Sequence, residues 1–145
     1  MKFVLVATDG SASAGRAISL AAEIAKTFEA TLHIVNVLEA FAPANDALDC
    51  EANGGTAPSF EMLAATASEI LVTARERALS VGARRVQIET RTGPVAETIL
   101  EVARDENADT IVIGKRGHGR VAGLLLGSVS QKVTCEAFCP VVVAP

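Results

Sequence analysis

The sequence predicts an α/β fold in which a parallel five-stranded sheet is covered by helices on both faces. Short apolar segments alternate along the 145-residue chain with longer segments whose apolar residues recur at helical spacing. Such alternation is typical of parallel strands joined by helical crossovers. The apolar segments hold few polar residues, as expected for strands buried on both faces. Half of the residues are hydrophobic, so a single domain spanning residues 1–145 can bury a sizeable core.

The first quarter of the chain contains two predicted strands separated by a helix. The segment KFVLVAT, residues 2–8, is apolar almost throughout and forms the first strand. Residues 11–28 follow as a helix, because their apolar side chains share one helical face and Ser11 or Ser13 can cap the start. The segment TLHIVNVL, residues 31–38, is the second strand.

The middle of the chain is predicted to hold a long loop, a helix and a strand near an edge of the sheet. Residues 39–58 are rich in Pro, Gly, Asn and Asp and predict a loop, which at this length is either functional or mobile. A long helix begins at about Ser59, with apolar side chains along one face. Residues 85–91 alternate between polar and apolar side chains, as a strand near a sheet edge does.

The last third of the chain adds two helices and two strands. Gly93 and Pro94 open the third helix, since proline fits a first helical turn. The segment ADTIVIG, residues 108–114, is a buried strand, residues 128–138 form the fourth helix, and PVVVAP, residues 140–145, is the closing strand.

Composition excludes several classes of function. The chain has no Trp, no Tyr and a net charge of −4, which argues against binding of nucleic acid. No apolar run reaches the roughly 20 residues of a membrane-spanning helix, and the N-terminal run is too short for a signal peptide. Cys50, Cys135 and Cys139 form no CxxC pair and lack partners for a metal site. We therefore expect a soluble, cytoplasmic protein with reduced thiols and no bound metal in its structure.

The segment GKRGHGRVAGLLLGSVSQ, residues 114–131 (the glycine segment), carries the strongest chemical signal. Glycine at position 127 leaves the backbone open to close approach by a ligand. The S-x-x-Q pattern from Ser128 to Gln131 predicts a capping box at the start of a helix. Free amides at a helix start attract anions, and three basic side chains in the segment add positive charge.

Two better-known glycine motifs are excluded. The glycine spacing after the first strand imitates a P-loop, but Arg16 and Ala17 stand where that loop needs Lys and Ser or Thr. The glycine segment is spaced GxGxxxG and follows the fourth strand, so it is not a dinucleotide fingerprint. Ligands of open parallel sheets bind beyond the carboxyl ends of the strands. Asp9, at the end of the first strand, is therefore either a turn residue or an acceptor for a ribose hydroxyl.

The pattern Gly114-x-x-Gly117, nine residues and then Gly127-Ser128 resembles the nucleotide-binding signature of the universal stress proteins. The first strand and the closing CPVVVAP are similar to that family as well, so the resemblance covers essentially the whole chain. It implies a Rossmann-like fold of the adenine nucleotide alpha hydrolase type, strand order 3-2-1-4-5, and a subclass that binds ATP with or without Mg²⁺. The chain departs from many members at Asn36 and Lys115.

Position by position, the resemblance implies a nucleotide site at the strand ends. Asp9 would lie toward the ribose, Val37 would meet adenine through its backbone, and Ile113 and Gly114 would end the fourth strand against the nucleoside. The residues implied to surround the phosphates are Gly117, Gly127, Ser128 and Val129. With no Trp or Tyr available, adenine must sit in an aliphatic slot. The residues expected to bind the cofactor (the expected binding set) are Ala7, Thr8, Asp9, Val37, Ile113, Gly114, Gly117, His118, Gly127, Ser128 and Val129.

The predicted function is a nucleotide-dependent regulatory module of a stress response, not an enzyme. Hydrolysis of ATP needs an oriented water, usually with a metal and a base. Neither His33, in mid-strand, nor His118, in the glycine segment, is a convincing base. Two alternatives stay open: a slow ATPase or self-phosphorylating protein acting through Ser128 or Ser130, and a dimeric interaction protein that binds no nucleotide.

The closing strand predicts a homodimer. Under the implied strand order it lies at an edge, where unpaired N–H and C=O groups are exposed and are usually guarded by charge. Residues 140–145 carry no charged side chain. Pairing of the strand around Val141, Val142 and Val143 with a second copy about a twofold axis removes the exposure. The alternative is that a helix or loop of the same chain covers the edge.

Overall fold

The computed structural model describes residues 1–39, 59–118 and 125–145, and there the strands and helices alternate as predicted. The elements are β1 (Phe3–Ala7), α1 (Ala12–Thr27), β2 (Thr31–Leu38), α3 (Phe60–Val81), β3 (Arg85–Thr92), α4 (Val95–Asp105), β4 (Thr110–Gly114), α5 (Ser128–Glu136) and β5 (Val141–Ala144). Each predicted strand and helix is confirmed, with ends shifted by one or two residues where they differ. The loop predicted over residues 39–58 lies, beyond Glu39, outside the described residues.

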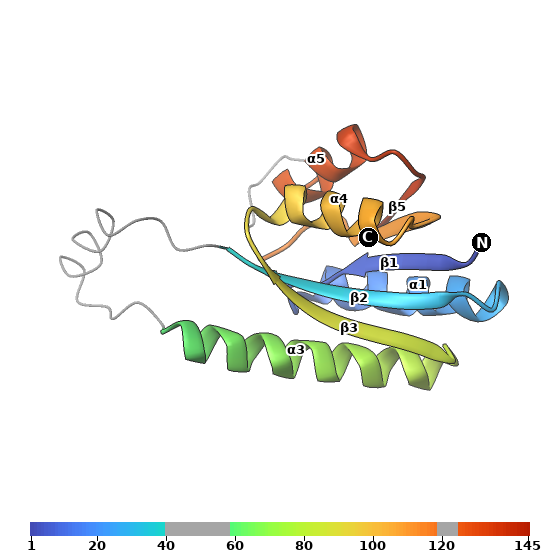
Figure 1. The fold of residues 1–145 in the computed structure, drawn as a ribbon, viewed down its shortest axis with the longest axis horizontal. Coiled ribbons are helices and arrows are strands. Elements are labelled where there is room, and N and C mark those ends of the chain that lie inside the picture. The colour runs from blue at the N-terminus through green and yellow to red at the C-terminus, as the bar shows by residue number, and fades with distance from the viewer. Residues whose placement is uncertain (40–58, 119–124) are drawn as a thin grey trace.

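The five strands form one parallel sheet in the order β3-β2-β1-β4-β5 (Figure 1). This confirms the fold class and the strand order implied by the resemblance. Along the chain, β2 and β3 are added on one side of β1, and β4 and β5 are then added on its other side. The order therefore reverses between β1 and β4, which is where sheets of this kind hold their ligands. The strand predicted near an edge, β3, is indeed an edge strand.

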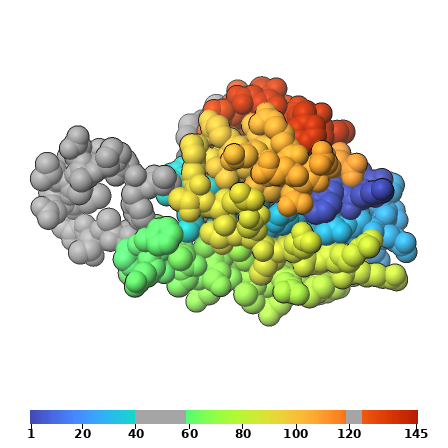
Figure 2. Space-filling model, in the orientation of Figure 1, coloured from blue at the N-terminus to red at the C-terminus, as the bar shows by residue number. Residues whose placement is uncertain are grey.

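Helices cover both faces of the sheet and bury two apolar cores. Helices α1 and α3 pack on one face and α4 and α5 on the other (Figure 1), so α3 and α5 form opposite surfaces of the molecule (Figure 2). The buried side of α1 is largely alanine, which lets this helix lie close to the strands. Among the described helices, none is both long and apolar enough to cross a membrane.

The helix starts follow the chemistry of their first residues. Ser11 caps α1 by accepting a hydrogen bond from the Ala14 amide at 3.2 Å, and Ser59 caps α3 in the same way. Of the two serines proposed for α1, Ser11 is therefore the cap. Pro94 precedes the first helical residue of α4 instead of lying inside its first turn.

Asp109 fastens the start of β1 to the segment that leads into β4. Its Oδ2 accepts hydrogen bonds from the amides of Lys2 at 2.6 Å and Phe3 at 2.8 Å. These two bonds hold the pKa of the Asp109 carboxyl below its ordinary value, since they favour the charged form. The carboxylate thus stabilises the central strand pair from outside the sheet.

We expect Asp109→Ala to lower the free energy of unfolding by about 1 kcal/mol at neutral pH, because two hydrogen bonds are lost at an exposed position. The thermal midpoint should fall by roughly 2–4 °C. Because the folded-state pKa is lowered, this contribution is complete above the ordinary pKa of about 3.9 and is lost as the pH falls through the folded value. Urea titrations of both proteins between neutral and acidic pH measure the difference.

The matched control is Asp105→Ala, which removes another exposed carboxylate, at the end of α4. A negative charge at a helix C-terminus is unfavourable, so this change should be neutral or slightly stabilising. Equal stability of the Asp109→Ala variant and the parent at neutral pH would contradict the role of Asp109.

Candidate functional site

A cavity of about 250 Å³ opens at the carboxyl edge of the sheet, where the strand order reverses. The structure brings the whole expected binding set into its lining: Ala7, Thr8, Asp9, Val37, Ile113, Gly114, Gly117, His118, Gly127, Ser128 and Val129. It adds Ser11, Ala14, Val35, Val95, Ile99, Arg116 and Ser130. Residues from five separate described segments of the chain therefore meet at one place.

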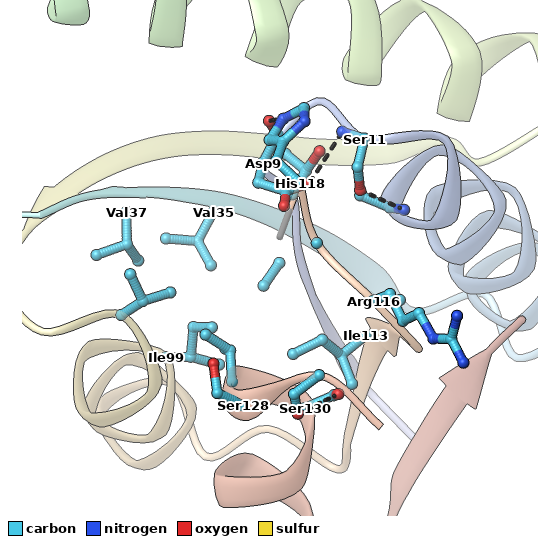
Figure 3. Close-up of a pocket in the computed structure, with 18 residues that line it drawn as sticks. Asp9, Ser11, Val35, Val37, Ile99, Ile113, Arg116, His118, Ser128 and Ser130 are labelled. Atoms are coloured by element: carbon cyan, nitrogen blue, oxygen red, sulfur yellow. Dashed lines mark hydrogen bonds between the residues drawn. The ribbon is translucent and has the colours of Figure 1, made fainter. Parts of the chain in front are cut away.

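One wall of the cavity is aliphatic. Val35 and Val37 of β2 and Ile113 of β4 contribute to it, together with Val95 and Ile99 from the start of α4 (Figure 3). The sequence analysis missed the contribution of α4. The sequence feature that could have predicted this contribution is the pair Val95 and Ile99. These residues are four apart and therefore lie on one face of the helix that follows β3. A flat apolar group such as a purine base fits a wall of this composition.

Next to this wall, the backbone of β2 continues past the end of β1. The Val35 carbonyl accepts a hydrogen bond from the Thr8 amide at 2.9 Å, so the peptide groups of Val35 point toward β1. Alternate residues of a strand point their peptide groups to the same side, so those of Val37 point the same way. Since β1 ends at Ala7, Val37 has no strand residue opposite it there. Its N–H and C=O therefore face the cavity.

The turn between β1 and α1 is fixed by short hydrogen bonds. The buried Asn36 side chain donates to the Thr8 carbonyl at 2.8 Å, and the Ser11 amide donates to Asp9 Oδ1 at 2.9 Å. Gly10 takes a φ of 81°, which glycine adopts without strain. Asn36, one of the two departures from the family pattern, thus helps to place Asp9 at the cavity.

The predicted capping box at the start of α5 is wrong, although the helix begins at Ser128 as expected. The cap residue is Gly127, whose carbonyl accepts from the Gln131 amide at 2.9 Å, and Ser128 is the first helical residue and is exposed. A residue already inside the helix cannot cap it with its own side chain. The Ser130 hydroxyl is buried and contacts the carbonyl oxygens of Lys115 and Gly127, each at 3.0 Å.

This arrangement leaves the positive end of α5 open toward the cavity. Within the described chain no side chain caps the helix. The first amides of a helix have no acceptor inside it, so those of Ser128, Val129 and Ser130 are available to a ligand. All three residues line the cavity, and amides at a helix start together with the helix dipole favour an anion.

The three signature glycines are glycine for three different reasons. At Gly114 a methyl group would lie 2.8 Å from the Ser13 carbonyl carbon and 2.9 Å from the Ala14 nitrogen, so the packing of β4 against α1 excludes it. At Gly117 it would lie 2.6 Å from Asp9 Oδ2. At Gly127 the nearest atoms of the described residues, its chain neighbours apart, would be 3.5 Å away, an ordinary contact distance. Backbone packing therefore explains Gly114, contact with the end of one side chain, Asp9, distinguishes Gly117, and no close contact within the described chain accounts for Gly127.

Charged side chains around the cavity are few. Among its described lining residues, Asp9 is the one carboxylate, while Arg116 and His118 are the other ionisable side chains. Lys115 does not line the cavity, and Arg120 lies outside the described residues. No three His, Cys, Asp or Glu side chains of the described chain lie close enough to hold a metal ion.

The cysteines lie elsewhere. Cys135 is an exposed thiol on α5, and Cys139 is a half-buried thiol that precedes β5. Burial raises the pKa of the Cys139 thiol, which lowers the fraction of reactive thiolate. Cys50 is outside the described residues.

Comparison with known proteins identifies the family. The family model "Universal stress protein family" matches residues 1–145. The chain is 39% identical to a universal stress protein of Thermus aquaticus, with 97% of this chain and 96% of that protein covered. It is 37% identical to the universal stress protein Rv1636 of Mycobacterium tuberculosis, with 98% and 94% covered. The chain therefore belongs to the universal stress protein family.

Solved structures agree with this assignment. The universal stress protein UspA from Lactobacillus plantarum superposes with a TM-score of 0.80 at 25% identity, with 99% of this chain and 97% of that chain covered. A universal stress protein solved in complex with cAMP superposes with a TM-score of 0.70 at 26% identity, with 99% and 95% covered.

Proposed function

We propose that this chain binds ATP in the cavity at the carboxyl edge of its sheet and acts as a nucleotide-dependent regulatory module. The observation that carries the proposal is Gly127, which the packing of the described protein does not require, at the open start of α5. The family membership and the relative solved with cAMP support an adenine nucleotide as the ligand.

The base would be read by the backbone of β2. Adenine presents an amino donor beside a ring-nitrogen acceptor on one edge, and the C=O and N–H of Val37 are a matching acceptor and donor. Guanine presents a carbonyl oxygen and a ring N–H in the reverse order, which would oppose like groups of Val37. The aliphatic wall would enclose the ring between Val35, Ile99 and Ile113.

The phosphates would lie at the start of α5. The amides of Ser128 and Val129 can donate to phosphate oxygens, and a helix N-terminus favours negative charge. The Gly127 backbone has room for a phosphate to approach its Cα. Mg²⁺ would arrive bound to the phosphates, since it keeps most of its waters and Asp9 is the one carboxylate in the described lining.

We expect Gly127→Val to weaken ATP binding by at least about tenfold, because a branched side chain would occupy the space that a phosphate needs. The fold should survive, since Gly127 has φ −67° and ψ 163°, an extended conformation open to Val. Apart from the two neighbouring residues, no atom of the described chain lies closer than 3.5 Å to the added Cβ. Gly127→Ala should give an intermediate affinity. Isothermal calorimetry with ATP measures all three proteins.

The control for this series is Gly15→Ala, in the first turn of α1 and outside the cavity lining, which should bind ATP as the parent does. GTP should bind the parent more weakly than ATP. If a folded Gly127→Val variant binds ATP as tightly as the parent does, the phosphates do not lie at this helix start.

We also propose that ATP is bound without rapid turnover. The ionisable side chains of the described lining are already engaged: His118 Nε2 contacts the Asp9 carbonyl at 2.7 Å, and Asp9 Oδ1 accepts the Ser11 amide. Of the two serines that self-phosphorylation would use, Ser130 is buried and bonded to two carbonyls. Ser128 is exposed at the helix start, so it is the one serine that favours the self-phosphorylation alternative.

Steady-state hydrolysis with Mg²⁺ should therefore be far below the roughly 1–10³ s⁻¹ of ordinary enzymes. Radiolabelled ATP measures both phosphate release and transfer to protein. Substoichiometric label that disappears in Ser128→Ala but not in Ser130→Ala would favour slow self-phosphorylation. A rate near 1 s⁻¹ that depends on Mg²⁺ and on one cavity side chain would overturn the binding-module proposal.

The chain is further proposed to form a homodimer through β5. In the described sheet, β5 pairs with β4 on one side and has no strand on the other. Val141, Val142 and Val143 are half-buried, and residues 140–145 carry no charge. The Pro140 carbonyl accepts from the Ile111 amide of β4, and the Ala144 carbonyl accepts from the Lys115 amide just after β4. Even-numbered residues of this segment therefore point their peptide groups toward β4. The odd-numbered Val141 and Val143 therefore present theirs at the outer edge.

Light scattering after size exclusion should show a dimer for the parent at micromolar concentration. Val143→Pro removes an outward N–H and should give a monomer or an aggregate. Val142→Pro is the comparison, because it removes an inward N–H and should destabilise the sheet of the monomer itself. Circular dichroism checks the fold of each variant. A parent that stays monomeric would contradict the proposed interface.

A further inference from the structure

Asp9 is held from two sides by segments that are far apart in the sequence. Within its own turn, Asp9 Oδ1 accepts the Ser11 amide at 2.9 Å. From the glycine segment, His118 Nε2 lies 2.7 Å from the Asp9 carbonyl oxygen. A methyl group on Gly117 would come within 2.6 Å of Asp9 Oδ2, so this carboxylate oxygen rests directly over the glycine Cα. Figure 3 shows Asp9 and His118 together on the side of the cavity opposite Ser128.

We propose that Gly117 and His118 (the Asp9 clamp) are positioning residues that set the carboxylate of Asp9 for recognition of a ribose hydroxyl. Glycine at position 117 is then required by the sugar end of the ligand and not by the phosphates. The inference rests on the proposed function, because a nucleoside sugar is the group that Asp9 would bind. It assigns different ligand groups to two glycines of one signature: Gly117 to the ribose and Gly127 to the phosphate.

The backbone does not itself require glycine at position 117. Among the described glycines, positive φ angles occur only at Gly10, Gly82 and Gly93. The atom that an alanine side chain would displace is the end of the Asp9 side chain, which can rotate away at little cost to folding. Gly117→Ala should therefore fold and misplace one carboxylate. This contrasts with Gly114, where the displaced atoms belong to the backbone of α1.

His118 supplies the second half of the clamp. A carbonyl oxygen only accepts, so the ring nitrogen facing it, Nε2, carries the proton and donates. The bond fixes the main chain of Asp9 while Gly117 gives room to its side chain. His118→Ala removes the donor. In His118→Gln, the side-chain amide N–H₂ lies about as far from the backbone as Nε2 does and can donate in its place. His118→Gln should therefore restore part of what His118→Ala loses.

The first experiment compares AMP with 2′,3′-dideoxy-AMP by calorimetry. A hydrogen bond to a charged acceptor contributes about tenfold or more in affinity, so the parent should prefer AMP by about that factor. Gly117→Ala should lose most of this preference while binding of the dideoxy compound changes little. His118→Ala should lose part of it, and His118→Gln should recover some. Gly127→Ala is the control, because it should weaken both compounds alike and keep the preference.

The second experiment needs no ligand. Gly117→Ala should shift the Ser11 amide resonance in a ¹H–¹⁵N spectrum, since Asp9 Oδ1 accepts that amide, and Gly127→Ala should leave it in place. A parent that binds no adenine nucleotide, with the Ser11 shift present, would overturn the proposed function and with it the recognition of ribose, while the positioning of Asp9 by Gly117 would stand. Gly117→Ala with an intact AMP preference, or with an unmoved Ser11 resonance, would overturn the clamp and keep nucleotide binding.

Discussion

The carboxyl edge of this molecule depends on how closely α1 approaches the end of β4. No side chain fits at Gly114, because a methyl group there would lie 2.8 Å from a backbone carbon of α1. At this separation the Ser13 hydroxyl comes within 3.4 Å of both the Ala144 carbonyl and the Arg116 amide. The start of α1, the end of β5 and the backbone after β4 are thereby joined. The turn that carries Asp9 leads directly into α1, so it lies where Gly117 and His118 can contact it.

The backbone of one residue, Lys115, links the candidate site to the edge of the sheet. The Lys115 amide donates to the Ala144 carbonyl at 2.6 Å, and the Lys115 carbonyl accepts from the Gly127 amide at 2.8 Å and from Ser130 Oγ. The last residue of β5 and the cap of α5 are therefore both bonded to Lys115. These contacts all use the backbone of Lys115, so they do not depend on its side chain.

Much of the fold was predictable, because the signals that set it are local. Periodic apolar residues gave each strand and helix, and Ser11 and Ser59 cap helices as their type predicts. The predictions that failed, or that could not be made, depend on contacts between segments distant in the sequence. The S-x-x-Q pattern at Ser128 satisfied the local rule, but the cap position went to Gly127, whose amide bonds to Lys115 across the loop. The contribution of α4 to the aliphatic wall was not predicted, because it depends on how that helix packs on the sheet. Contacts such as His118 with Asp9, 109 residues apart, leave no trace in sequence spacing.

The polar groups of the cavity support the proposal that the site binds its ligand without rapid turnover. Several of them belong to the backbone: the peptide groups of Val37 and the first amides of α5. Backbone groups are placed by the sheet and the helix themselves, so they distinguish ligands by hydrogen-bond pattern and by shape without further adjustment. Transfer of a proton or phosphoryl group needs in addition a side chain that can change its protonation state or attack. In the described lining, Asp9 and His118 are the side chains closest to that role. Both form hydrogen bonds that stabilise the turn between β1 and α1. Under the proposed function, a ligand bound to these backbone groups would contact several segments at once and so couple its presence to their arrangement, which is what a regulatory module requires.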